Sequence, residues 1–173
     1  TDLTGKLIVV IDDESAIVDG MQALLSGWGA DVIGSTTGDD VLSAVHAAGR
    51  LPDLLIVDHR LGSHENGIEV AQRIRRELDP EIPGILVTGS ISPDLDAVAR
   101  AANLEFLLKP VMANKLRGLI ATIQGFVERS GPTVIHTRGR PSSATQAPVA
   151  EGEPPVASNA AADVVMWHAQ FGP

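Results

Sequence analysis

Six polar residues follow or end four short apolar segments of this 173-residue chain. They are Asp12, Asp13, Glu14, Asp58, Thr88 and Lys109. Clustered carboxylates repel one another, so they need a divalent cation or a protonated member when they share a site. Oxygen ligands of this kind suit Mg²⁺, which takes one or two carboxylates, a carbonyl, waters and a phosphate oxygen. The hydroxyl and the ammonium would then contact the remaining phosphate oxygens, so the set indicates magnesium-dependent phosphate chemistry.

Apolar, β-branched runs alternate along the chain with segments of helical periodicity. The expected strands are 7–11, 31–35, 54–57, 85–88 and 105–108. The expected helices are one around Ile17–Leu25, then 39–48, 67–78, 93–102 and 113–128. Gly27 or Gly29 is expected to end the first helix, and Thr37 or Asp39 to cap the second. This alternation predicts an α/β fold, a doubly wound parallel sheet with helices on both faces. Ligands of such sheets bind at the carboxyl ends of the strands, where the polar residues are expected to meet.

The chain resembles the receiver domain of two-component response regulators over roughly residues 6–128. The likeness rests on Val-Val-Ile-Asp-Asp-Glu at 9–14, Leu-Ile-Val-Asp at 55–58, Leu-Val-Thr-Gly at 86–89 and Leu-Lys-Pro at 108–110. Each motif is weak alone, but four in order at the expected strand ends are specific. The resemblance implies a flavodoxin-like fold, with strand order 2-1-3-4-5 and five helices.

The resemblance also implies a role for each site residue. Asp58 would be the phosphoacceptor, a carboxylate nucleophile that attacks a phosphohistidine with Mg²⁺ present. The metal ligands would be Asp13 directly, Asp12 through water, Asp58 and the backbone carbonyl of Arg60. Thr88 and Lys109 would contact the phosphoryl oxygens. Phe106 matches an aromatic switch position, working together with Thr88, and Pro110 matches a proline that typically follows a cis peptide bond.

The loop after Asp58 departs from the commonest family pattern. It reads His-Arg-Leu-Gly-Ser-His-Glu-Asn-Gly and lacks the frequent Met-Pro turn, so the local register of 62–66 is left open. Arg60 and Ser90, two residues beyond Asp58 and Thr88, are expected to influence the lifetime of the phosphoryl group. The loop, the Thr-Gly-Ser at 88–90 and the Leu-Thr-Gly at 3–5 are most like receivers at the C-terminus of hybrid sensor histidine kinases.

Each residue also has an ordinary structural interpretation. Asp13 or Ser15 could cap the first helix, Thr88 a turn, and Lys109 could be a solvated surface charge. Asp58 could be a loop acid and Phe106 plain core. His59 and His64 are interpreted as surface residues. If all these structural interpretations held, four motifs would have to lie together by coincidence at one end of one sheet.

Two other function classes stay open from the sequence. A Mg²⁺-dependent phosphatase or hydrolase of similar topology would place its nucleophile in an Asp-x-Asp arrangement on the first strand, whereas Asp12 and Asp13 are adjacent and point to opposite sides. A degenerate receiver that acts only as an interaction module would not need the intact acidic set. Whether the chain counts as an enzyme is left open, since a receiver catalyses its own phosphorylation and the whole protein could be a kinase.

Charge and composition limit the partners. Asp and Glu number 22 against 13 Lys and Arg, a formal net charge of −9, which argues against direct nucleic-acid binding. No apolar run approaches the roughly 20 residues that cross a bilayer, so this chain is not expected to contact a membrane. We expect a cytoplasmic location for it, even if the whole protein is anchored in a membrane. The expected partner is a histidine kinase or a histidine phosphotransfer protein, and a homodimer is left open.

The chain is expected to hold one domain with two appendages. Residues 1–5 are interpreted as a linker, 6–129 as the receiver domain and 130–173 as a low-complexity, disordered tail, because six of the eleven prolines lie beyond residue 130. Within the tail, 161–171 carries apolar residues that could dock on the domain or on a partner.

Overall fold

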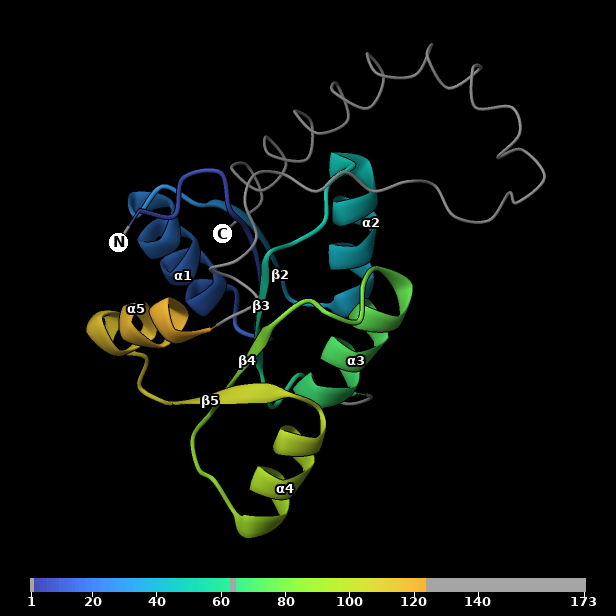
Figure 1. The fold of residues 1–173 in the computed structure, drawn as a ribbon, viewed down its shortest axis with the longest axis vertical. Helices are drawn as coiled ribbons and strands as arrows, with labels where there is room; N and C mark the ends of the chain where they lie inside the picture. Colours follow the sequence, from blue (N-terminus) through green and yellow to red (C-terminus); the bar gives the residue numbers. More distant parts are fainter. Residues whose placement is uncertain (1, 63–64, 124–173) are drawn as a thin grey trace, which may run out of the picture.

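The computed structural model describes residues 2–62 and 65–123, in which five strands alternate with five helices (Figure 1). The strands are β1 (Leu7–Ile11), β2 (Asp31–Ser35), β3 (Leu54–Asp58), β4 (Gly84–Thr88) and β5 (Leu104–Leu108). The helices are α1 (Ser15–Gly27), α2 (Gly38–Ala48), α3 (Gly67–Glu77), α4 (Pro93–Ala101) and α5 (Ala113–Thr122). The strands form one parallel sheet in the order β2-β1-β3-β4-β5. The predicted α/β fold and its strand order are therefore confirmed.

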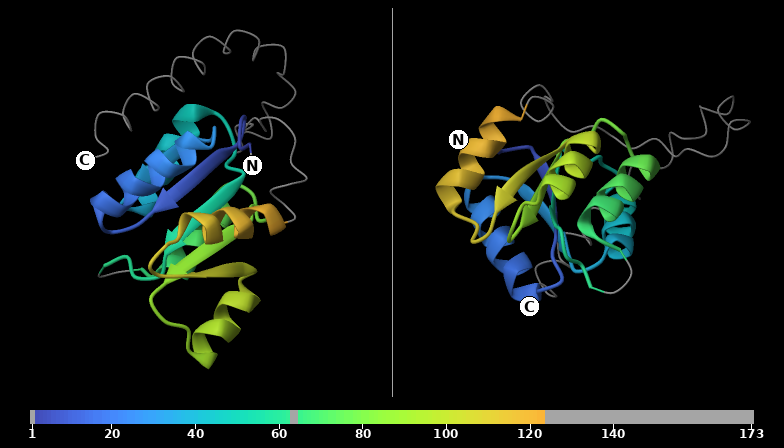
Figure 2. Two further views of the ribbon diagram at one scale, coloured as in Figure 1. Left: turned by 90° about the vertical axis from the view of Figure 1, so that its left-hand side faces the viewer. Right: turned by 90° about the horizontal axis from the view of Figure 1, so that it is seen from below.

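The helices cover both faces of the sheet, α1 and α5 on one and α2, α3 and α4 on the other (Figure 2). Successive strand residues face opposite sides, so Ile8 and Val10 pack beneath α1 and α5 while Val9 and Ile11 pack beneath α2 and α3. Both faces of the central strands are buried, which explains their continuous apolar runs.

The local signals for helix ends mostly match the structure. Thr37 caps α2 by accepting a hydrogen bond from the Asp40 amide, and Ser92 caps α4 in the same way before Pro93. The first helix ends at Gly27, as expected. The fifth helix was expected to reach Glu128, but the structure ends it at Thr122, and 124–128 lie outside the described residues.

A side-chain hydrogen bond accompanies the end of α5. The Thr122 hydroxyl donates to the Leu119 carbonyl at 2.8 Å, which is the acceptor that the next turn of helix would use. The Ile123 amide donates instead to the Ile120 carbonyl, and the backbone of Ile123 is extended. Ile123 nonetheless packs into the core beneath α1 and α5.

The segment before β1 packs on the domain, although 1–5 was expected to be a linker. Leu3 is 2% exposed and belongs to the core beneath α1 and α5. Its amide donates to the Trp28 carbonyl at 2.9 Å, and Arg50 donates to the Gly5 carbonyl at 2.5 Å. The packed domain therefore includes Leu3. The predicted tail at 130–173 lies outside the described residues.

A buried arginine ties α3 to the opposite end of the sheet from the polar strand ends. Arg75 is 5% exposed, and its guanidinium donates to the carbonyls of Ile82, Ala102 and Asn103. Burial lowers the pKa of Arg75, partly offset by the charge of Glu81. The C-terminal end of α4 is thereby attached to α3.

Candidate phosphoacceptor and metal site

The four sequence motifs meet at the carboxyl edge of the sheet. The register pairs Ile11 with Val57 and Asp58 with Val87, so the ends of β1, β3 and β4 lie side by side. Thr88 pairs with Leu108 at the end of β5, one residue before Lys109. Parallel pairing thus brings residues far apart in the sequence to a single site.

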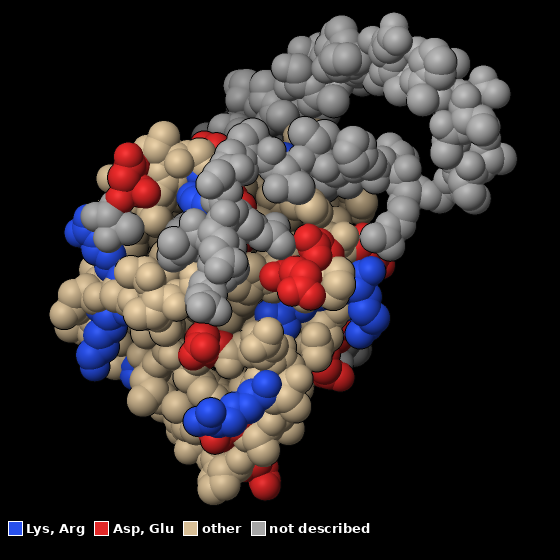
Figure 3. All heavy atoms as spheres, in the orientation of Figure 1, with Lys and Arg blue, Asp and Glu red and all other residues tan. Residues whose placement is uncertain are grey.

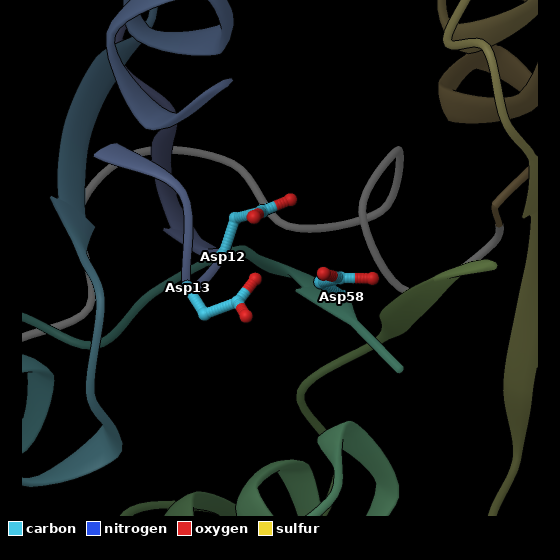
Figure 4. A group of neighbouring side chains, drawn as sticks. All are labelled: Asp12, Asp13 and Asp58. Atoms are coloured by element: carbon cyan, nitrogen blue, oxygen red, sulfur yellow. The ribbon is translucent and has the colours of Figure 1, made fainter. Parts of the chain in front are cut away.

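Three aspartates form the acidic part of this site (Figure 4). Carboxylate oxygens of Asp12, Asp13 and Asp58 all lie within 4.8 Å of one another. Asp12 and Asp58 are buried, 3% and 4% exposed, whereas Asp13 is exposed. A hard divalent cation that keeps some of its waters, such as Mg²⁺, fits this half-open set of oxygen ligands.

Asp12 is held by the turn that leads into α1. Its Oδ1 accepts a hydrogen bond from the Glu14 amide at 2.9 Å. Burial, which outweighs this hydrogen bond, and the neighbouring charge of Asp58 raise the pKa of Asp12 to about 6. The N-cap of α1 is Glu14, without a side-chain hydrogen bond, so the alternative that Asp13 or Ser15 caps this helix is wrong.

Lys109 supplies the positive charge of the site. Its Nζ lies 3.1 Å from Oδ1 of Asp58, and its side chain is 32% exposed. Burial alone would lower the pKa of Lys109, but the hydrogen bond to Asp58 and the charges of Asp58, Asp12 and Glu14 raise it overall. Lys109 is therefore an ion-paired cation and not a solvated surface charge. The Lys109–Pro110 peptide bond is cis.

Thr88 is buried at the end of β4, with its hydroxyl turned to the following loop. Oγ1 donates to the Ser90 carbonyl at 2.9 Å and accepts from the Ser90 amide at 3.4 Å. In this structure the hydroxyl therefore stabilises a local turn, which is the ordinary interpretation of this residue. Phe106, which pairs with Leu86 in the sheet, is half-buried on the side of α3 and α4.

The loop between β3 and α3 closes against the strand that carries Asp58. Arg60 and Asn66 face each other in an antiparallel bridge, and the Gly67 amide donates to the His59 carbonyl at 2.8 Å. Asn66 also caps α3 in a reciprocal capping box with Glu69. This settles the register around Asn66, while 63–64, which include the predicted surface residue His64, lie outside the described residues.

Gly67 was not singled out from the sequence, yet the site depends on it. A Cβ atom at this position would lie 2.1 Å from the carbonyl oxygen of Asp58. The Asn-Gly pair before the apolar positions of α3 is the sequence signal that could have indicated this close approach.

Two hollows open beside Asp58 and Lys109. A polar one of about 390 Å³ is lined by residues of the β3–α3 and β4–α4 loops, among them His59, Arg60, Thr88, Ser90 and Ser92. A larger one of about 660 Å³ runs over the sheet toward α1 and the segment after β5, and its walls are mostly apolar, among them Ile17, Gly20, Leu24, Pro110 and Val111. The site thus has a polar side and an apolar side.

Figure 3 shows acidic and basic side chains interspersed on the visible face, with no continuous basic patch there.

A family model for the response regulator receiver domain matches residues 8–121 of the chain. Among curated proteins, the transcriptional regulatory protein ZraR of Salmonella typhimurium is 32% identical over 118 residues, which cover 66% of this chain and 26% of that protein. The Regulator of RpoS of Escherichia coli is 30% identical over 122 residues, 68% of this chain and 34% of that protein. The chain thus spans about a quarter to a third of the length of these relatives.

Solved structures show the same fold. The receiver domain of NtrX from Brucella abortus is 26% identical with a TM-score of 0.61, covering 70% of this chain and 99% of that one. A CheY-like receiver domain protein from Methanospirillum hungatei is 25% identical with a TM-score of 0.59, covering 67% of this chain and 90% of that one.

Proposed function

This chain belongs to the family of response regulator receiver domains, and on that premise we propose that Asp58 accepts a phosphoryl group from a phosphohistidine. The observation that carries the proposal is the position of Asp58, a buried carboxylate with Lys109 on one side and two further aspartates on the other. Of these three clustered aspartates, Asp58 is the one whose carboxylate forms an ion pair with Lys109.

The transfer exchanges one bond to phosphorus for another. A carboxylate oxygen of Asp58 attacks the phosphorus, a P–O bond forms, and the P–N bond breaks with its electron pair going to the imidazole of the donor. The donor histidine leaves neutral once it holds a proton, and the product is an aspartyl phosphate. Lys109 already contacts Asp58 and would follow the charge onto the phosphoryl oxygens.

Asp12, Asp13 and Asp58 would hold Mg²⁺, together with the backbone carbonyl of Arg60. Their oxygen-only chemistry and half-open arrangement support this set. A bound Mg²⁺ would neutralise charge as the phosphoryl group approaches three carboxylates. Thr88 would serve the same oxygens after exchanging its hydrogen bond with Ser90, and Arg60 and Ser90, which line the polar hollow, would influence how long the phosphoryl group stays.

The donor is a histidine kinase or a histidine phosphotransfer protein. Its phosphohistidine must reach a buried carboxylate, and the apolar hollow formed by Ile17, Gly20, Leu24 and Val111 opens directly beside Asp58 and Lys109. We assign this hollow to the donor's apolar surface.

The net charge of −9 supports the absence of nucleic-acid binding by this chain itself. No helix of the residues described here has both the length and the apolar character to span a membrane.

Intact-mass measurement tests the acceptor. With Mg²⁺ and acetyl phosphate, the wild-type chain should gain one acid-labile phosphoryl group, and Asp58→Asn should gain none. Asp40→Asn, which changes an exposed aspartate of α2, is the matched control and should label like the wild type. Equal labelling of the wild type and Asp58→Asn would place the acceptor elsewhere, and sustained turnover of a chromogenic phosphomonoester would instead favour a hydrolase.

A second experiment tests the metal. Mg²⁺ should raise the melting temperature of the wild type in proportion to the logarithm of its concentration, and Asp13→Ala should strongly reduce this effect. Because that substitution removes a repulsive charge, the metal-free protein should be no less stable than the wild type. A wild-type melting temperature that does not respond to Mg²⁺ would contradict the site.

A further inference from the structure

Arg73 of α3 connects the loop after Asp58 to the beginning of α2. Its Nε and Nη2 donate to the two carboxylate oxygens of Glu65 at 3.1 and 2.7 Å, and its Nη1 pairs with Asp39. Two parallel hydrogen bonds between a guanidinium and a carboxylate fix the direction as well as the distance of the pair. The side chains of Arg73 and Glu65 are 23% and 37% exposed, so this pair is partly shielded from water, whereas Asp39 is 84% exposed.

Glu65 belongs to the part of the loop that faces Arg60. It directly precedes Asn66, which lies opposite Arg60 in the antiparallel bridge. The hydrogen bond that supports this bridge runs from the Gly67 amide to the His59 carbonyl, so the Arg60 carbonyl is not part of it. The guanidinium of Arg73 therefore holds the strand of the loop that in turn fixes the backbone of Arg60.

The position of the guanidinium is itself prepared by a small residue. A Cβ atom at Gly38, the first residue of α2, would lie 2.7 Å from Nη2 of Arg73. Any larger residue at this position would push the guanidinium from its place between Glu65 and Asp39.

We propose that Arg73 is a positioning residue for phosphorylation of Asp58: through its bidentate contact with Glu65 it holds the β3–α3 loop so that the Arg60 carbonyl faces the metal. The inference rests on the proposed function, because it assigns Arg73 a part in that same site. Arg73 itself contacts neither the phosphoryl group nor the metal. Its effect passes through Glu65 and the loop backbone.

The experiment compares Mg²⁺ affinity with metal-free stability in five proteins that span the same 173 residues. They are the wild type, Arg73→Met, Glu65→Gln, the double variant of these two and Asp39→Asn. Calorimetric titration gives the Mg²⁺ dissociation constant, thermal denaturation in a chelator gives the metal-free stability, and acetyl phosphate labelling gives the rate at Asp58. Asp39→Asn is the matched control, because it breaks the other ion pair of Arg73 without touching the loop.

Arg73→Met and Glu65→Gln should each weaken Mg²⁺ binding and slow labelling by roughly threefold to tenfold, the size expected for loss of a partly buried bidentate pair. The double substitution should weaken binding no more than the stronger single one, because both act through one contact. Asp39→Asn should bind Mg²⁺ like the wild type. If Arg73→Met fails to fold, Glu65→Gln in the exposed loop carries the test alone.

Failure of the inference is distinct from failure of the proposed function. Unchanged Mg²⁺ affinity in Arg73→Met and in Glu65→Gln, with only the metal-free stability lowered, would show that Arg73 is merely structural and would overturn the inference. Equal loss of affinity in Asp39→Asn would do the same. A wild type that neither binds Mg²⁺ nor labels would instead remove the proposed function.

Discussion

Gly67 packs directly on the peptide carbonyl of Asp58, with room for a hydrogen atom and nothing larger. The contact fixes where the strand ends and the loop begins, and the Gly67 amide adds a hydrogen bond to the next carbonyl, that of His59. The shape of the acidic site is therefore determined partly by a residue that has no side chain.

Gly67→Ala is expected to damage the site and the fold together. The added methyl group must displace the Asp58 backbone, and overpacking of this kind costs about 1–3 kcal/mol of unfolding free energy. Denaturant unfolding and Mg²⁺ titration should both register the change. Gly118→Ala in α5 is the matched control, since its Cβ would meet no atom within 4 Å, and it should stabilise the protein by roughly 0.5–1 kcal/mol. Unaltered Mg²⁺ affinity in Gly67→Ala would contradict this account of the contact.

The raised pKa of Asp12 predicts how stability depends on pH without metal. Between its ordinary value of 3.8 and about 6, the folded chain keeps a proton on Asp12 that the unfolded chain has released. The folded state then binds more protons, so the free energy of unfolding should fall as pH rises through this window. Chemical denaturation in a chelator between pH 4 and about 7 measures the slope, and Asp12→Asn should flatten it.

Mg²⁺ should counteract this dependence. A cation binds the ionised carboxylate, so the stabilisation that Mg²⁺ provides should grow as pH rises through about 6. The difference in melting temperature with and without Mg²⁺, measured at each pH, tests whether this stabilisation grows. A constant difference across the range would mean that Asp12 does not titrate with the site.

Lys109→Met should destabilise the metal-free protein more than the metal-bound one. Removing the ammonium leaves Asp58 and Asp12 buried together without that positive charge, at a cost of roughly 1–3 kcal/mol. Saturating Mg²⁺ should recover much of the loss because it supplies a cation at the same place, while labelling of Asp58 stays slow. Lys115→Met, an exposed lysine of α5, should change neither quantity. Equal destabilisation with and without Mg²⁺ would separate Lys109 from the acidic site.

Phosphorylation is expected to shift a balance between two states of the region around β4 and β5. Movement of the Thr88 hydroxyl toward the phosphoryl group would free space that the half-buried Phe106 ring can enter. The ring carries no polar atom, so it needs no hydrogen-bond partner in either state. In NMR spectra of the beryllofluoride-treated protein, which mimics the aspartyl phosphate, shifts should spread from Asp58 through Thr88 to Phe106 and Lys115. Shifts confined to the three aspartates would indicate a passive phosphoryl carrier.

The fold and the meeting of the strand ends were predictable because they depend on patterns that repeat along the chain. Buried parallel strands require uninterrupted apolar runs, and the geometry of a parallel sheet then brings their ends together without reference to any particular contact. The residues after those runs, such as Asp12 and Lys109, could therefore be placed in one site from sequence alone.

Contacts between single side chains were not predictable in this way. The burial of Leu3 leaves no periodicity, because one apolar residue between polar neighbours looks the same in a linker. The pairing of Arg73 with Glu65 depends on how an unusual loop closes. The end of α5 at Thr122 falls within a helical pattern that the sequence continues through Val127. The Thr88 hydroxyl can likewise donate to different neighbouring acceptors, and the sequence does not indicate that it donates to the Ser90 carbonyl.

The hydrogen bond between the Thr88 hydroxyl and the Ser90 carbonyl has a consequence for signal strength. The hydroxyl of Thr88 has a single proton, and the Ser90 carbonyl holds it in the structure. A phosphoryl oxygen must replace this acceptor. The free energy gained on phosphorylation is therefore the difference between two hydrogen bonds and not the full strength of one. The difference in free energy between two such hydrogen bonds is small. The geometry of the loop at Ser90 would then act as a gain control, setting how completely the domain responds when Asp58 is modified.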